Sequence, residues 1–229
     1  MGRHVKLSDR EKEWFRPHHR SQERFMDTRE ERKRFLIVCE GAKTEPHYFE
    51  AFNKILQQHV VQLDIHGEGA NTLSLVARAQ HIRDSRLSGD YPFDQVWVVF
   101  DRDSVESDDF DNAIHKAKSA GMHCAWSNEA FEIWYILHFE YRNTGMSRTE
   151  YQSALSDLLG EPYQKNAPDM YLKLLRYGKQ AQAVTWARKL HDEFLTFGTP
   201  PSQSNPCTTV FLLVEELNRF KVNRGEGSE

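Results

Sequence analysis

The sequence has few cysteines and no long apolar run. Its cysteines, Cys39, Cys124 and Cys207, are an odd number and lie far apart, without the spacing of a metal site or a disulfide pair. No apolar stretch approaches the ~20 residues that a membrane-spanning helix needs, and the charged first residues lack the apolar segment of a signal peptide. We therefore expect buried free thiols and a cytoplasmic protein that does not enter membranes.

An overall excess of positive charge is also missing. The formal net charge is −4, which argues against a general coat for nucleic acid. The charge is nevertheless uneven, because residues 1–34 contain 11 Lys or Arg and 7 Asp or Glu. We expect a basic N-terminal arm over residues 1–34 beside an acidic body. Such an arm suits a phosphate-rich partner, although a solvated tail that binds nothing has the same composition.

What the sequence does have is a regular alternation of strand and helix patterns. Short hydrophobic runs predict strands, and apolar residues at helical spacing follow each of them. This order predicts a parallel sheet flanked by helices in one α/β domain over residues 35–144. The predicted strands cover residues 35–39, 60–65, 95–100 and 122–126, and the predicted helices cover residues 45–57, 71–84, 110–120 and 127–139.

The pattern becomes helical beyond residue 145. Apolar residues at helical spacing predict one helix around residues 151–159 and a longer one over residues 183–194. Asn205 and Pro206 are suited to cap and begin a last helix that bears Val210 and Leu217. We expect a helical C-terminal subdomain over residues 145–224.

Acidic residues directly follow two of the predicted strands. Glu40 follows the first strand, and Asp101 and Asp103 follow the third. The carboxyl ends of parallel strands share one edge of a sheet, where open α/β folds build ligand sites. Carboxylates gathered there repel one another unless a cation joins them, and Mg²⁺ or Mn²⁺ prefers such oxygen ligands. The alternative is that these residues only serve turns and solvated loops.

Two further residues extend this candidate site. Lys43 lies at the start of the helix that follows Glu40 and Gly41, a position that favours a phosphate. Glu132 lies on a predicted helix that is apolar on nearly every face, and a buried carboxylate there needs a cation or hydrogen-bond donors. The 11 histidines form no ligand-like cluster, and for His47 and His138 a structural role is the simpler interpretation.

Four groups of residues carry a resemblance to known proteins. A strand followed by Glu40, and a later strand followed by Asp101-x-Asp103, resemble the TOPRIM domain of topoisomerases, primases and overcoming-lysogenization-defect nucleases. All four groups together resemble the RloB-like family and cover about residues 35–220. The groups are Val38-Cys39-Glu40-Gly41-x-Lys43-Thr44-Glu45-Pro46-x-Tyr48-Phe49, Phe100-Asp101-x-Asp103, Ser127-Asn128-x-Ala130-Phe131-Glu132-Ile133-Trp134 and Asn205-Pro206-x-Thr208.

The resemblance implies a TOPRIM-like (Rossmann-like) fold and a setting in prokaryotic restriction or phage-defence loci beside an ATPase partner. It also implies that Glu40 acts as general acid/base or metal ligand and that Asp101 and Asp103 bind magnesium. Asn128 and Glu132 carry over from the family's fourth helix. No tyrosine nucleophile module accompanies these motifs, so we do not expect strand passage by a topoisomerase mechanism.

These observations lead to a Mg²⁺- or Mn²⁺-dependent nuclease that acts on DNA or RNA, including tRNA. Glu40, Asp101, Asp103 and Glu132 are the expected metal ligands, and Lys43 is expected to stabilise charge on the reacting phosphate. Binding to nucleic acid should then weaken steeply with salt. One alternative is a regulatory module of a defence complex that binds without catalysis, and another is nucleotidyl transfer as in primases. A homo-oligomer is compatible with the sequence.

Overall fold

The computed structural model describes residues 32–69, 71–87, 91–103 and 105–222. Most of the predicted basic arm, residues 1–31, therefore lies outside the described residues. The described residues belong to one compact unit, and the division expected at residue 144 stays a prediction. No helix in the described ranges is long and apolar enough to cross a membrane.

A five-stranded sheet forms the centre of this unit, with the strand order β2-β1-β3-β4-β5. β1 pairs with β2 and β3 in parallel, and β3 pairs with β4 in parallel. β5 is short and pairs with β4 in the antiparallel direction. The strands are β1 (Lys33–Cys39), β2 (Val61–Gly67), β3 (Gln95–Asp101), β4 (His123–Asn128) and β5 (Cys207–Thr208).

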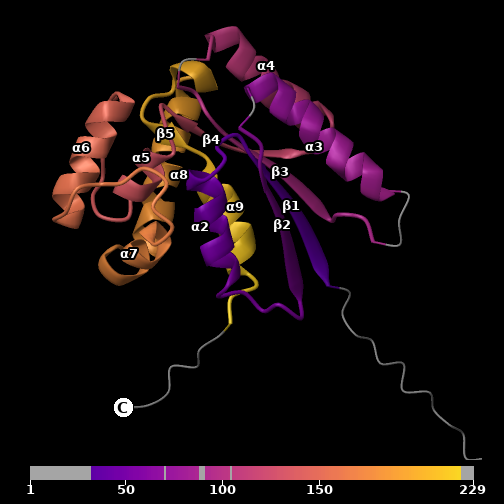
Figure 1. The fold of residues 1–229 in the computed structure, drawn as a ribbon. Helices are drawn as coiled ribbons and strands as arrows, with labels where there is room; N and C mark the ends of the chain where they lie inside the picture. Colours follow the sequence, from indigo (N-terminus) through magenta and orange to yellow (C-terminus); the bar gives the residue numbers. More distant parts are fainter. Residues whose placement is uncertain (1–31, 70, 88–90, 104, 223–229) are drawn as a thin grey trace, which may run out of the picture. The chain divides into compact units, whose positions relative to one another are not determined.

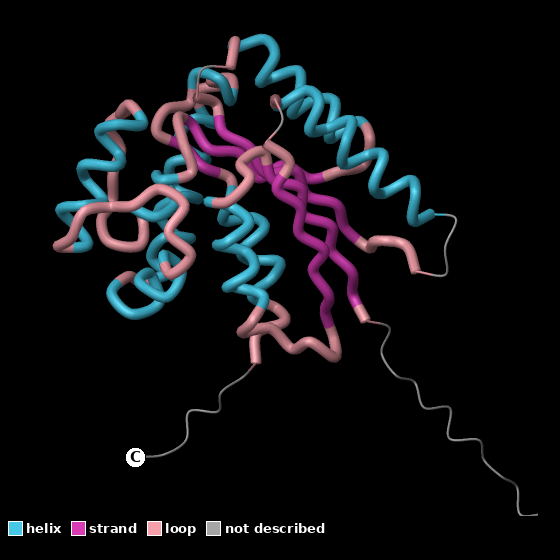
Figure 2. The backbone as a smooth tube through the Cα atoms, viewed as in Figure 1, coloured by secondary structure: helices cyan, strands magenta, loops and turns pink. Residues whose placement is uncertain are grey.

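Helices cover both faces of the sheet (Figures 1 and 2). α3 and α4 lie on one face, and α2 and α9 lie on the other, where α5 to α8 extend the layer. The helices are α2 (Thr44–Asn53), α3 (Thr72–Leu87), α4 (Ser107–Ser119), α5 (Glu132–Ile136), α6 (Arg148–Leu159), α7 (Met170–Tyr177), α8 (Gln180–Thr196) and α9 (Val210–Asn218).

β1 and β3 are buried on both faces because their residues are apolar without alternation. Successive side chains of a strand point to opposite faces. Leu36 and Val98 therefore pack against α3 and α4, whereas Ile37 and Val99 pack against the layer that contains α2 and α9. The structure is a Rossmann-like α/β fold with a mostly parallel sheet, which confirms the fold class predicted from the sequence.

The helix predicted over residues 127–139 is wrong at its start. β4 continues to Asn128, where Ser127 and Asn128 pair with β5, and α5 covers only Glu132–Ile136. Backbone pairing with a strand some 80 residues later overrides the local helical pattern. Ser127 and Asn128 are therefore strand residues rather than helix caps.

The last helix also begins later than its cap signal predicts. Asn205 and Pro206 are joined by a cis peptide bond and lead into β5, and α9 begins only at Val210. The strand occupies the residues that were expected to form the first helical turn. α7 was not predicted, because its sequence Met170–Tyr177 is short. β5 and α9 together attach the C-terminal segment to the central sheet.

Candidate active site

The carboxyl ends of β1 and β3 lie side by side where the sheet order changes direction, between strands that are not consecutive in the chain. Ligands bind at such switch points in open α/β sheets. Glu40 leaves β1 at this point, and its backbone N–H donates to the Val99 carbonyl at 2.8 Å. The backbone N–H of Asp101 in turn donates to Glu40 Oε2 at 3.2 Å. The sheet therefore holds these two acidic residues next to each other.

Glu40 is held by a second donor from the neighbouring helix. Thr72, at the start of α3, donates its hydroxyl to Glu40 Oε1 at 3.3 Å. Burial raises the pKa of Glu40, and the charge of Asp103 adds to this effect. The hydrogen bonds from Asp101 and Thr72 oppose it, because they favour the ionised carboxylate. Burial outweighs these hydrogen bonds, so the pKa of Glu40 remains above its ordinary value.

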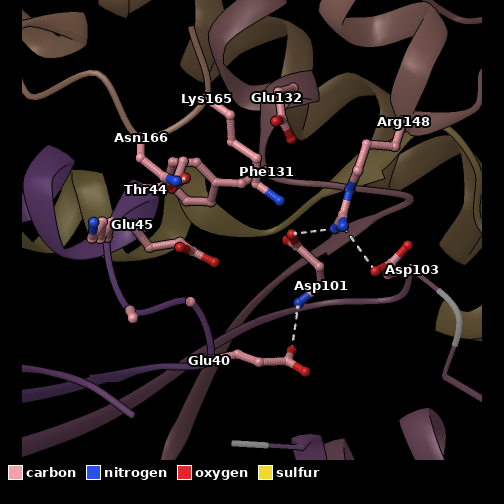
Figure 3. Close-up of a pocket in the computed structure, with 13 residues that line it drawn as sticks. Glu40, Thr44, Glu45, Asp101, Asp103, Phe131, Glu132, Arg148, Lys165 and Asn166 are labelled. Carbon is pink, nitrogen blue, oxygen red and sulfur yellow. Dashed lines mark hydrogen bonds and ion pairs between the residues drawn. The ribbon is translucent and has the colours of Figure 1, made fainter. Parts of the chain in front are cut away.

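Asp101 and Asp103 share one arginine. Arg148, the first residue of α6, places Nη2 at 3.3 Å from Asp101 Oδ2 and Nη1 at 2.8 Å from Asp103 Oδ2. Figure 3 shows these three side chains pointing toward one another. Asp103 has a positive φ of 33°. The sheet end and α6 therefore meet at an ion pair that spans both members of the Asp-x-Asp motif.

The other oxygen of Asp101, Oδ1, is buried and has no hydrogen-bond partner among the described residues. The pKa of Asp101 lies well above its ordinary value, mainly because of burial and then because of the charges of Glu45 and Glu132. Arg148 lowers this pKa but does not cancel the other effects. A buried acceptor without a donor is unfavourable, so Asp101 Oδ1 can gain from a cation or a donor that the described residues do not supply.

Two more carboxylates point into the same pocket (Figure 3). Glu132, in the first turn of α5, is 2% exposed and accepts a hydrogen bond from the Tyr163 hydroxyl at 3.3 Å. Glu45, in the first turn of α2, is 4% exposed. Burial raises the pKa of Glu45, with further contributions from Glu132 and Glu40. A side chain at Gly41 would displace the Glu45 carboxylate from its present position.

The loop between α6 and α7 forms the opposite wall. Asn166 accepts a hydrogen bond from the Thr44 hydroxyl at 2.7 Å, and its carbonyl lies 3.1 Å from His47 Nδ1. Lys165 and Lys43 line the pocket from the two walls. The resulting pocket has a volume of about 400 Å³. It combines the carboxylates of Glu40, Glu45, Asp101, Asp103 and Glu132 with the cations of Lys43, Arg148 and Lys165.

All five site residues predicted from the sequence line this one pocket, namely Glu40, Lys43, Asp101, Asp103 and Glu132. Asn128 does not, because its amide donates to the carbonyls of Pro201 and Ser202 and joins β4 to that loop. His138 is buried beside Trp134, whose carbonyl lies 2.8 Å from its Nδ1. His47 supports the loop at Asn166 rather than the pocket.

Three charged residues of the pocket, Glu45, Arg148 and Lys165, were not predicted as site residues. Glu45 had a signal, because it precedes Tyr48 and Phe49 by three and four residues and so shares their buried face of α2. Arg148 and Lys165 had none. Each lies more than 40 residues beyond Asp101 in the sequence. A charged residue at the start of a helix or in a loop is common, so its position alone does not indicate a pocket.

The donor chemistry of the pocket fits a hard divalent cation. Carboxylate oxygens outnumber the internal positive charges, and Asp101 Oδ1 is buried without a partner. As the side chains stand, however, no three His, Cys, Asp or Glu residues of the described ranges are arranged to hold a metal. One carboxylate oxygen of Asp101 and one of Asp103 instead contact Arg148.

The fold and the pocket together define a class, namely a Rossmann-like α/β protein with an acidic site at its sheet switch point. Comparison with protein families assigns the chain more narrowly. The family described as RloB-like protein matches residues 35–217, and the chain belongs to this family. A search of curated proteins and a search of solved structures each found no significant match.

Proposed function

We propose that this protein is a metal-dependent nuclease of the TOPRIM type that hydrolyses phosphodiester bonds in DNA or RNA, including tRNA. The observation that carries the proposal is the convergence of five carboxylates on one pocket at the ends of β1 and β3. Glu40, Asp101, Asp103 and Glu132 are the proposed ligands of Mg²⁺ or Mn²⁺, and Glu45 adds to their negative charge. A bound divalent cation would supply charge neutralisation and an activated water nucleophile.

The protein's own groups have distinct roles in this reaction. Glu40, which the backbone of Asp101 and the hydroxyl of Thr72 hold in place, accepts a proton from the attacking water. Lys43, at the amino end of α2, attracts the negative charge that develops on the phosphate, and the helix dipole acts in the same direction. Lys165 faces the same pocket from the opposite loop and binds a neighbouring phosphate.

The proposed biological setting is a prokaryotic restriction or phage-defence locus in which an ATPase accompanies the nuclease. This setting rests on membership of the RloB-like family and on the resemblance of the Glu40 and Asp101-x-Asp103 motifs to TOPRIM nucleases.

A second candidate function is a regulatory module that binds a partner without catalysis. The ion pairs of Arg148 favour it, because they give Asp101 and Asp103 a partner from within the protein without any added ion. Under this hypothesis the buried carboxylates serve the structure of the α6 junction, and nucleic acid is not cleaved.

The deciding experiment incubates the purified full chain with DNA, total RNA and tRNA over a range of Mg²⁺ and Mn²⁺ concentrations. Asp101→Ala tests the site, and Asp109→Asn, an exposed acidic residue in the first turn of α4, serves as the matched control. We expect cleavage that needs the cation, that falls by a factor of ~100 or more in Asp101→Ala and that is unchanged in Asp109→Asn.

Cleavage that persists in Asp101→Ala would show that a different site or a contaminant is responsible. A protein that binds the cation but cleaves none of the substrates is retested with the ATPase from its own locus. Failure there as well would favour the regulatory module.

A further inference from the structure

Arg148 occupies the position between the two residues that are expected to hold a metal most directly. Its guanidinium contacts one oxygen of Asp101 and one oxygen of Asp103, across 47 and 45 residues of sequence. Of the three cations in the pocket, Arg148 forms these ion pairs, whereas Lys43 and Lys165 form none with another described residue. The neutralisation of the Asp-x-Asp motif therefore depends on one side chain from outside the strand region.

This arrangement leaves both partners incompletely satisfied. Asp101 Oδ1 and Arg148 Nε are each buried without a hydrogen-bond partner in the described structure. Arginine normally neutralises a carboxylate through two parallel hydrogen bonds, but here the fork is divided between two carboxylates. The contact therefore leaves free binding capacity on the aspartates and on the guanidinium.

The backbone of Arg148 is fixed although its side chain is long. Ser147 caps α6, with Glu150 completing a capping box, and Tyr151 and Leu155 anchor the helix in the core. The Arg148 side chain is 28% exposed and ends in the pocket. The guanidinium can thus change its contacts by side-chain rotation while α6 stays in place.

We propose that Arg148 acts as an internal cation that competes with the divalent metal for Asp101 and Asp103 and, once displaced, binds a substrate phosphate. This inference rests on the proposed function and adds a coupling between metal binding and phosphate binding. Asp101 and Asp103 would be neutralised by a bound metal in place of Arg148, and the guanidinium would then be repelled by the metal's charge. A displaced guanidinium in a pocket beside Lys43 and Lys165 matches the geometry of a phosphate.

The test measures Mn²⁺ binding by the full chain, with free Mn²⁺ followed by electron paramagnetic resonance. Arg148→Gln removes the charge and keeps much of the length, and Arg148→Lys keeps the charge. Arg188→Gln is the matched control, because Arg188 pairs with Glu215 between α8 and α9, away from the pocket. We expect Arg148→Gln to bind Mn²⁺ roughly three- to tenfold more tightly than the unmodified protein. Arg148→Lys and Arg188→Gln should stay within about twofold of it.

Equal or weaker Mn²⁺ binding by Arg148→Gln would overturn the inference and show that the arginine only positions the aspartates. In the same variants, binding of a short oligonucleotide in the presence of metal should fall for Arg148→Gln and remain unchanged for Arg188→Gln. Unchanged oligonucleotide binding by Arg148→Gln would show that Arg148 does not bind a substrate phosphate.

A second measurement needs no substitution at the site. In the unmodified protein labelled on arginine, addition of Mg²⁺ should shift the side-chain nuclear magnetic resonance signal of Arg148 and leave that of Arg188 in place. An Arg148 signal that does not move while Mg²⁺ binds would contradict displacement.

The outcomes separate this inference from the proposed function. Tighter Mn²⁺ binding by Arg148→Gln, together with no cleavage by the unmodified protein alone or with the ATPase from its locus, would support the competition and reject the nuclease. Cleavage that needs metal, with unchanged Mn²⁺ affinity in Arg148→Gln, would support the nuclease and reject the competition. Absence of Mn²⁺ binding in all forms would reject both.

Discussion

At the scale of the residue, the ionisation of Glu40 depends on two donors that come from different elements. Asp101 donates from the neighbouring strand and Thr72 donates from α3, while burial acts against the charged form. Thr72 is itself 1% exposed, so water does not replace its hydroxyl freely. Removal of this one hydroxyl therefore changes the pKa of the Glu40 carboxylate and leaves the other pocket residues in place.

Thr72→Val keeps the shape of the side chain and removes the hydrogen bond to Glu40. The pKa of Glu40 should rise further, because the ionised form loses a donor. If Glu40 accepts the proton in the reaction, the acidic limb of the pH profile of kcat/KM moves to higher pH. We expect roughly three- to tenfold lower activity at the acidic end and a plateau at high pH within about twofold of the unmodified protein.

Ser74→Ala provides the control, since the Ser74 hydroxyl donates to the Asn71 carbonyl in the same helical turn and does not contact Glu40. A uniform loss of activity at every pH in Thr72→Val would mean that the hydroxyl matters for structure rather than for the ionisation of Glu40.

The sequence predicted Glu40, Asp101, Asp103 and Glu132 because carboxylates at strand ends and in apolar helices stand out against their neighbours. Glu45 could have been found by the same reasoning from its spacing to Tyr48. The partner of Asp101 and Asp103 could not, because an arginine at the start of a helix is ordinary in sequence, and only the packing of α6 brings Arg148 to the strand ends.

At the scale of the element, the loop between α6 and α7 is attached to the start of α2 through one residue. Asn166 accepts a hydrogen bond from Thr44, contacts His47 through its carbonyl and has a positive φ of 70°. Asparagine tolerates this left-handed conformation better than most residues with a side chain. Asn166 therefore holds the loop, and Lys165 with it, against the wall that carries Glu45.

Asn166→Ala and Asn166→Gly test the two roles of this residue separately. Both lose the hydrogen bond from Thr44, but glycine adopts a positive φ without strain whereas alanine does not. We expect Asn166→Ala to have a free energy of unfolding about 1 kcal/mol lower than Asn166→Gly, measured by urea denaturation. Equal stability of the two variants would show that the backbone conformation at Asn166 carries no cost.

The order of strands and helices up to residue 139 followed from hydrophobic periodicity, and the structure confirms it. Hydrophobic periodicity did not predict where α5 and α9 begin. Both depend on β5, a strand of two residues whose pairing with Ser127 and Asn128 is settled by tertiary contacts. A strand this short has no periodicity to read.

At the scale of the whole molecule, the pH dependence of stability has contributions of opposite sign. The raised pKa values of Glu40, Glu45 and Asp101 mean that the folded protein binds protons more tightly there than the unfolded chain does. These carboxylates therefore favour folding as the pH falls toward their ordinary range. Buried His138 acts in the other direction.

His138 is 3% exposed, and burial lowers its pKa to about 4. The unfolded chain protonates this histidine near pH 6.5, so the unfolded state binds more protons between about pH 6.5 and 4. The contribution of His138 to stability is thus present above pH 6.5 and is lost as the pH falls through this window. Between pH 7 and 4.5, the unmodified protein should lose about 2–3 kcal/mol more stability than His138→Gln.

Denaturant unfolding of both proteins across this pH range makes the comparison, and the carboxylate contributions cancel because both proteins contain them. Parallel curves for the two proteins would mean that His138 is protonated equally in the folded and unfolded states.

The last helix also has a genetic consequence. α9 buries Val210, Leu213, Val214 and Leu217 in the core that includes alternate residues of β1 and β3, and the RloB-like match ends at residue 217. A premature stop codon upstream of α9 removes this part of the core, and one upstream of Cys207 removes β5 as well, even when every acidic pocket residue has already been translated. Such alleles should behave as complete loss-of-function alleles, whereas a stop codon after residue 222 spares every described element.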